Sequence, residues 1–154
     1  NIPYKAEQVH SISTKRALEE GLPLAEVLQT FTNDLQKTLL LVGHNIEFDV
    51  NIIGAELLRL NTSADQFLSL KTLDTGIAST AFCNLSGGIG GKLKMPRLSE
   101  LHEILFGKDF GDAHDAAYDV AATARCFFGL IGKSVITPAD ATAPADIVYE
   151  EPNL

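Results

Sequence analysis

The stretch LLLVGHNIEFD, from Leu39 to Asp49, decides the fold class. Its first part, residues 39–43, is an uninterrupted apolar run that is too short for a helix and is typical of a parallel strand covered on both faces. Asn45 can then cap a helix from about Ile46 to Leu60. Because a strand followed directly by a helix is the unit of α/β layers, the stretch predicts an α/β fold with a central sheet flanked by helices.

The flanking sequence supplies further elements. Residues 22–35 place apolar side chains at three- and four-residue steps, which predicts a helix that buries one face. Residues 61–97 are less regular, with a short strand or helix around 70–81 and a glycine-rich loop at 87–91.

Two more helices are predicted towards the C-terminus. Ser99 can cap the first of them, over residues 100–106, and Gly107 would end it. A long alanine-rich helix follows over residues 115–131 and is closed by Gly132.

Size and composition indicate one globular domain. The chain has 154 residues, of which 45% are hydrophobic and 21% charged, so we expect a domain over residues 1–136 and an acidic linker or tail, rich in proline and alanine, over 137–154. No apolar run approaches the roughly 18 residues of a membrane span, and the two cysteines match no disulfide or zinc pattern. We therefore expect a cytoplasmic protein.

The net charge of −8 argues against a broad basic surface that grips long nucleic acid. It does not exclude a nuclease, because an enzyme that holds only a strand end can use an acidic pocket neutralised by divalent cations.

Two aspartates are predicted to lie on the apolar faces of helices. Asp49 shares a face with Ile52, Ile53 and Leu60 at 100° per residue, and Asp119 repeats the arrangement in the last helix, with the apolar residues Ala122, Cys126, Phe127 and Leu130. An ionised carboxylate that faces an apolar interior needs a basic partner or a metal ion. The structural alternative is that each aspartate is an N-terminal helix residue stabilised by the helix dipole.

A histidine precedes each aspartate by five residues, His44 before Asp49 and His114 before Asp119. Five residues turn a helix by about 140°, so each histidine is expected in the loop before its helix. With an ordinary pKa near 6.5, such an imidazole can take a proton from a metal-bound water. We interpret His114 as a general base, and for His44 we favour a structural hydrogen-bonding role.

These segments resemble two motifs of the DnaQ-like, or DEDDh, exonucleases, the family of bacterial proofreading epsilon subunits. His44-Asn45-x-x-Phe48-Asp49 resembles the motif that carries the family's third carboxylate, and His114-x-x-x-x-Asp119 resembles the one that carries its general base and fourth carboxylate. Supporting stretches are residues 9–13, with Ser11 in place of the family's glycine, together with Asp74-Thr75 and residues 98–101. Residues 92–107 look closest to exonuclease domains fused to DNA polymerase III alpha chains.

The resemblance implies an RNase H-like fold and a two-metal mechanism with Mg²⁺ or Mn²⁺, in which Asp49 and Asp119 bind metal. It also implies a DNA 3′ end as substrate, proofreading as the role and the DNA polymerase III polymerase subunit or domain as partner. The family's first motif, Asp-x-Glu on the first strand, is absent from these residues. We therefore expect an N-terminally incomplete domain that is inactive alone.

Weaker candidates for substrate binding are His44, Asn45, Phe48 and Lys92. Phe48 can meet a frayed base, although buried packing is the simpler interpretation. Lys92 follows the glycine-rich loop and can touch a phosphate, or it can be a solvated surface residue.

Two alternative functions remain at this point. The dipeptide His114-Asp115 also fits a histidine-aspartate metal phosphohydrolase, a class with all-helical folds. The other alternative is a non-catalytic module that keeps the exonuclease shape for polymerase assembly.

Overall fold

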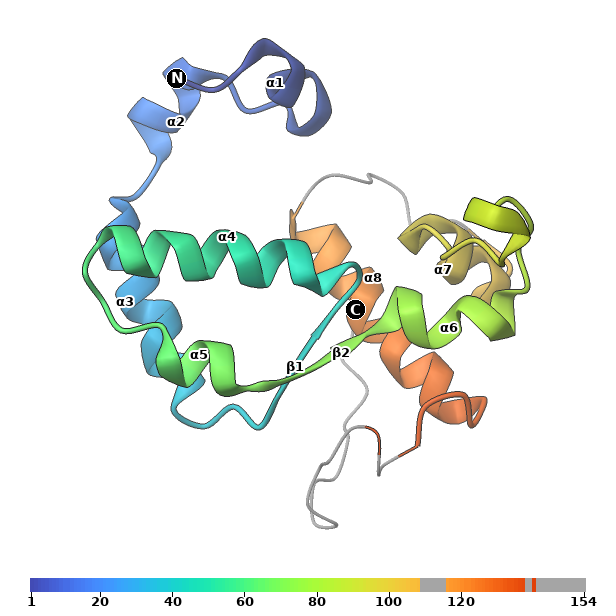
Figure 1. Cartoon of the computed structure of the whole chain (residues 1–154). Coiled ribbons are helices and arrows are strands. Elements are labelled where there is room, and N and C mark those ends of the chain that lie inside the picture. The colour runs from blue at the N-terminus through green and yellow to red at the C-terminus, as the bar shows by residue number, and fades with distance from the viewer. Residues whose placement is uncertain (109–115, 138–139, 141–154) are drawn as a thin grey trace. The chain divides into compact units, whose positions relative to one another are not determined.

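The computed structural model describes residues 1–108, 116–137 and 140. The chain forms two compact units, Asn1–Lys37 and Thr38–Leu154 (Figure 1). Apart from Thr137 and Asp140, the predicted tail lies outside the described residues.

The first unit consists of three helices: α1 (Tyr4–His10), α2 (Thr14–Glu20) and α3 (Leu24–Leu35). The helix expected over residues 22–35 is confirmed as α3. Neither α1 nor α2 was predicted from the sequence. Neither helix buries a residue, so their sequences lack the regular spacing of apolar residues that marks a helix packed on a core. Ser11 ends α1 with a left-handed φ of 57°, a conformation that suits the glycine of the resembling family better than serine.

The second unit contains a parallel pair of strands, β1 (Leu40–Gly43) and β2 (Lys71–Asp74), with Gly43 opposite Asp74. The predicted strand is therefore confirmed, and the uncertain region 70–81 contains a strand followed by a helix. A parallel pair contradicts the all-helical alternative, so the histidine-aspartate phosphohydrolase is excluded.

The second unit also contains helices, of which α4 (Ile46–Arg59), α6 (Thr75–Cys83) and α8 (Ala116–Gly132) pack against the strand pair. It further contains α5 (Asp65–Ser69), the 3₁₀ turn η1 (Ile89–Gly91) and α7 (Leu98–Phe106). Among the described residues, no helix is both long and apolar enough to cross a membrane.

The core lies where α7 and α8 pack on each other and on the strands. Its buried residues are Leu73, Leu101, Cys126, Phe127, Leu130 and Ile136, and Leu40 and Val42 of β1 pack against them. Burial raises the pKa of the Cys126 thiol to about 12, so this side chain stays protonated and behaves as a small apolar residue.

The sequence predicted the wrong capping residue for α7. The helix begins at Leu98 rather than after Ser99, and the Glu100 carboxylate accepts the Arg97 amide at 2.7 Å. Lys94 Nζ lies 2.6 Å from the other Glu100 oxygen. Gly107 ends the helix as predicted, with φ of 72°.

The apolar stripe predicted on α4 is only partly covered. Leu57 is buried, but Ile52 is 51% exposed, Leu60 is 41% exposed and the Asp49 side chain faces solvent. The buried residues of α4 are Ile46, Gly54 and Leu57. A hydrophobic period gives the direction of a buried face but not its width, and here α5 and β2 cover only one side of the stripe.

Candidate active site

The junction between β1 and α4 places Asp49. A Cβ on Gly43 would lie 2.7 Å from Cβ of Ile46, so a side chain is excluded where the chain leaves the strand. Asn45 then adopts a left-handed conformation with φ of 64°, which asparagine tolerates better than most residues. The tight turn brings α4 directly to the end of the sheet, with Asp49 in its first turn.

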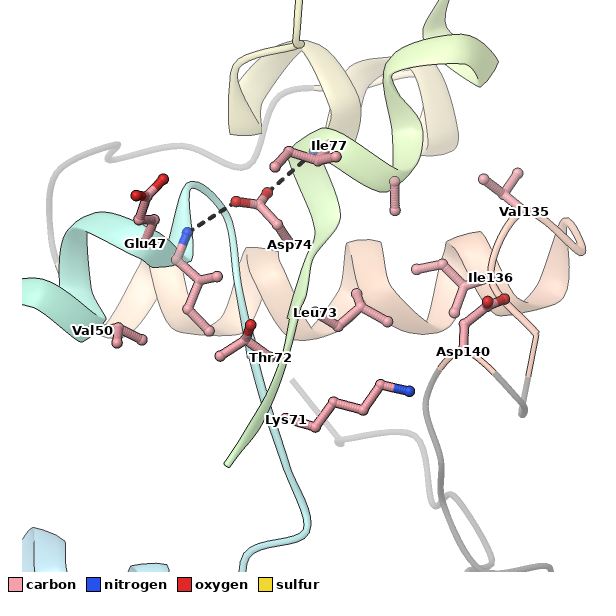
Figure 2. Close-up of a pocket in the computed structure, with 12 residues that line it drawn as sticks. Glu47, Val50, Lys71, Thr72, Leu73, Asp74, Ile77, Val135, Ile136 and Asp140 are labelled. Atoms are coloured by element: carbon pink, nitrogen blue, oxygen red, sulfur yellow. Dashed lines mark hydrogen bonds between the residues drawn. The ribbon is translucent and has the colours of Figure 1, made fainter. Parts of the chain in front are cut away.

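The predicted cap of α4 is corrected by the structure. Asn45 occupies the cap position, but its side chain makes no capping bond, because the left-handed turn replaces the extended backbone that an asparagine cap needs. The cap comes instead from β2: Asp74 Oδ2 accepts the Ile46 amide at 3.1 Å (Figure 2). Asp74 Oδ1 accepts the Asn45 amide at 3.2 Å.

Both ring nitrogens of His44 have partners inside the protein. Nε2 lies 2.9 Å from the Pro96 carbonyl oxygen, which can only accept, so Nε2 carries a proton. Nδ1 lies 3.0 Å from the Thr75 hydroxyl, which itself lies 3.0 Å from the Gly43 carbonyl oxygen. A contact between His44 and substrate would have to replace one of these bonds.

The surface around Asp49 is open and partly apolar. Phe48 is 63% exposed, so the expectation of buried packing is wrong for this side chain. It lies in the first turn of α4. A contact between Phe48 and a substrate stays a prediction.

Asp119 occupies the first turn of α8 and is half-buried. The apolar face predicted for this helix is confirmed, since Ala122, Cys126, Phe127 and Leu130 are all buried. Because α8 packs against β1 and α4 packs against β2, both aspartate-bearing helices contact the same pair of strands. The convergence of Asp49 and Asp119 on one ion stays a prediction.

Two predicted residues are not joined to this site by the structure. Lys92 is an exposed residue that follows η1, and its carbonyl accepts the Gly88 amide at 3.0 Å. The predicted general base His114, with Asp115, lies outside the described residues.

A pocket of about 770 Å³ lies beside the junction. Figure 2 shows it over β2, with Glu47 of α4, Asp74, Ile77 of α6 and Asp140 around it. Neither Asp49 nor Asp119 lines this pocket. Within the described ranges, no three histidine, cysteine or acidic side chains gather closely enough to form a metal site.

Asp74 was missed as a site residue by the sequence reasoning. Its signal was present, because an aspartate at the end of a strand pattern and directly before a helix is a good N-cap for that helix. Asp74 does cap α6, through Gly76 and Ile77. Its bonds to α4 carried no sequence signal, since that helix begins 28 residues earlier.

Comparison with known sequences places these features in a family. Residues 1–127 match the sequence model of the family described as "Exonuclease", and the chain belongs to that family. Its fold is therefore the RNase H-like exonuclease fold, with helices flanking a small parallel sheet in the residues described.

A curated relative is Ribonuclease T of Marinobacter nauticus, 33% identical over 123 residues. The match covers 77% of this chain and 52% of the relative. The chain thus spans about half the length of that protein.

Proposed function

We propose that this chain carries part of the active site of a metal-dependent 3′→5′ exonuclease. The observation that carries the proposal is the placement of two acidic side chains, Asp49 and Asp119, in the first turns of two helices that pack against the same strand pair, α4 against β2 and α8 against β1. Membership of the Exonuclease family supports the same reading. The product would be a nucleoside 5′-monophosphate released from a 3′ end.

The donor chemistry fits Mg²⁺ or Mn²⁺. Asp49 and Asp119 offer carboxylate oxygens, which these hard cations prefer, and neither carboxylate is engaged in a salt bridge among the described residues. A bound cation would neutralise charge on the phosphate and lower the pKa of a bound water. Both aspartates also lie where the helix N-terminus favours negative charge.

His114 is proposed as the general base. Its imidazole would accept the proton of the attacking water, a task for which a pKa near neutrality is suited. Asp119, five residues further on, lies in the first turn of α8.

The two carboxylates are proposed to be an incomplete ligand set. The described residues hold no cluster of three candidate ligands, and the side of α4 that carries Asp49 is uncovered. We propose that an Asp-x-Glu pair outside these 154 residues completes the site, and that the chain alone binds metal weakly and does not hydrolyse nucleic acid.

The substrate is proposed to be a single-stranded or frayed 3′ end. Proofreading of DNA beside a DNA polymerase III polymerase subunit is the form suggested by the sequence resemblance. The name of the relative, Ribonuclease T, supports an RNA end instead. The two differ in the 2′-hydroxyl, which a nuclease pocket can accept or reject.

The test uses the full natural protein that contains this chain. The protein is incubated with matched single-stranded DNA and RNA oligonucleotides carrying a 5′ label, with Mg²⁺, with Mn²⁺ or with EDTA. We expect stepwise 3′ shortening that EDTA abolishes. Asp49→Asn and Asp119→Asn should each lower the rate by roughly a hundred- to a thousandfold, the range seen when one electrostatic contact to the transition state is removed.

Asp65→Asn is the matched control, because Asp65 also lies in the first turn of a helix, α5, and makes no bond to α4 or α8 among those described. It should leave the rate unchanged. If all three variants cleave like the natural protein, the aspartates bind no catalytic metal and the non-catalytic module becomes the better interpretation.

A further inference from the structure

One carboxylate, that of Asp74, holds the N-termini of two helices. Asp74 is the last residue of β2 and accepts four backbone amides: Asn45 and Ile46 at the start of α4, and Gly76 and Ile77 at the start of α6. Because Gly43 and Asp74 are paired in the parallel register, the two strands end at the same level. A single side chain therefore bridges both strand-to-helix junctions (Figure 2).

The two carboxylate oxygens of Asp74 accept different backbone amides. Oδ1 accepts the Gly76 amide at 2.8 Å, the Ile77 amide at 3.2 Å and the Asn45 amide at 3.2 Å. Oδ2 accepts the Ile46 amide at 3.1 Å. The cap on α6 thus uses one oxygen, and the first helical residue of α4 uses the other.

The carboxylate is held in a packed junction. A Cβ added at Gly76 would lie 3.1 Å from Asp74 Oδ1, 3.1 Å from Met95 Sδ and 3.2 Å from His44 Cε1. The His44–Thr75 contact ties the same two chain segments a second time. Asn45 provides no cap of its own, so the start of α4 depends on a residue from another strand.

We propose that Asp74 is a positioning residue for the metal-dependent reaction. By fixing the first turn of α4 against β2, it fixes where the Asp49 carboxylate lies, although Asp74 itself touches neither metal nor substrate. This inference rests on the proposed nuclease function. The bridge that Asp74 forms between α4 and α6 does not depend on that function, because it follows from the hydrogen bonds alone.

Asp74→Asn in the full natural protein distinguishes the cap on α6 from the hydrogen bond to the Ile46 amide of α4. The amide keeps one acceptor oxygen, enough for the α6 cap, but replaces the other oxygen by a donor that faces the Ile46 amide. Hydrogen exchange followed by NMR should show faster exchange of the Ile46 amide, by about tenfold or more, with Gly76 and Ile77 little changed. Asp74→Ser, whose short side chain can cap α6 but not reach α4, should behave alike.

The functional readout is the Mn²⁺ concentration that gives half-maximal cleavage. We expect it to rise about tenfold in Asp74→Asn, in the range found when support of a metal ligand is lost, while the rate at saturating Mn²⁺ falls much less. Asp65→Asn, which makes the same charge change, should shift neither readout.

Each outcome is decisive. Faster exchange at Ile46 with an unchanged Mn²⁺ requirement would overturn the positioning role. Faster exchange at Gly76 and Ile77 alone would overturn the assignment of one Asp74 oxygen to the α6 cap and the other to Ile46. If the natural protein cleaves no substrate, the proposed function fails, while the exchange experiment still decides whether Asp74 bridges the helices.

Discussion

The two aspartate-bearing helices, α4 and α8, have similar sequence patterns but different surroundings. On α8 the predicted apolar face is buried, with Leu130 and Cys126 fully inaccessible. On α4 the predicted face is half open, with Ile52 and Leu60 exposed to solvent. The comparison shows that an apolar period identifies a helix with one preferred face, whereas the neighbouring elements decide how much of that face is covered.

The starts of α7 and α4 differ in a related way. α7 is capped by its own residue Glu100, three positions after Arg97. α4 is capped by Asp74 from another strand. A local cap can form before the fold is complete, but a cap from a distant strand requires that both strands are already paired.

The sharpest test of the comparison is the pair Leu130→Ala and Leu60→Ala. Leu130 is 0% exposed, so its truncation leaves a cavity and should lower the free energy of unfolding by about 2–5 kcal/mol. Leu60 is 41% exposed, and the same change should cost about 1 kcal/mol or less. Urea unfolding of both variants measures the difference. Equal losses would mean that the α4 stripe is covered after all.

A smaller effect is expected at the β1–α4 junction. Gly43→Ala forces a methyl group against Ile46 and should cost about 1–3 kcal/mol through overpacking. Gly132→Ala is the control, because a Cβ there meets nothing within 4 Å. In thermal unfolding, Gly43→Ala should melt earlier than the natural chain, and Gly132→Ala should not. A neutral Gly43→Ala would show that the junction can shift.

The smallest effect concerns the local cap of α7. The Arg97 amide and then Lys94 hold the pKa of Glu100 below its ordinary value of 4.5. A lowered folded-state pKa stabilises the fold above the unfolded-state pKa, and this contribution disappears as the pH falls through the folded-state value. Glu100→Gln should therefore cost about 0.5–1 kcal/mol at pH 7, a modest amount because the side chain is partly exposed.

Chemical unfolding of the natural chain and Glu100→Gln across pH 7 to pH 3 measures this contribution. The difference in stability should shrink as the pH drops below 4.5. A difference that stays constant with pH would assign the effect to packing rather than to the charge.

Much of the second unit could be predicted from sequence because its signals are local. The run before Gly43 predicted β1, and the alanine-rich period before Gly132 predicted α8. The helices α1 and α2 left no such signal because they bury no side chain. Ser99 was the wrong cap for α7 because the cap is Glu100, whose side chain folds back to the Arg97 amide.

Of the candidate site, the sequence alone singled out Asp49 and Asp119 as the side chains that we propose to bind metal. Both aspartates lie in the first turn of a helix, as the helix patterns in the sequence predicted. Only the tertiary structure decided that Asp74 holds α4 in place and that His44 bonds to Thr75 and Pro96. Hydrogen bonds between residues far apart in the chain depend on which strands pair and in what register, and no local pattern carries that information.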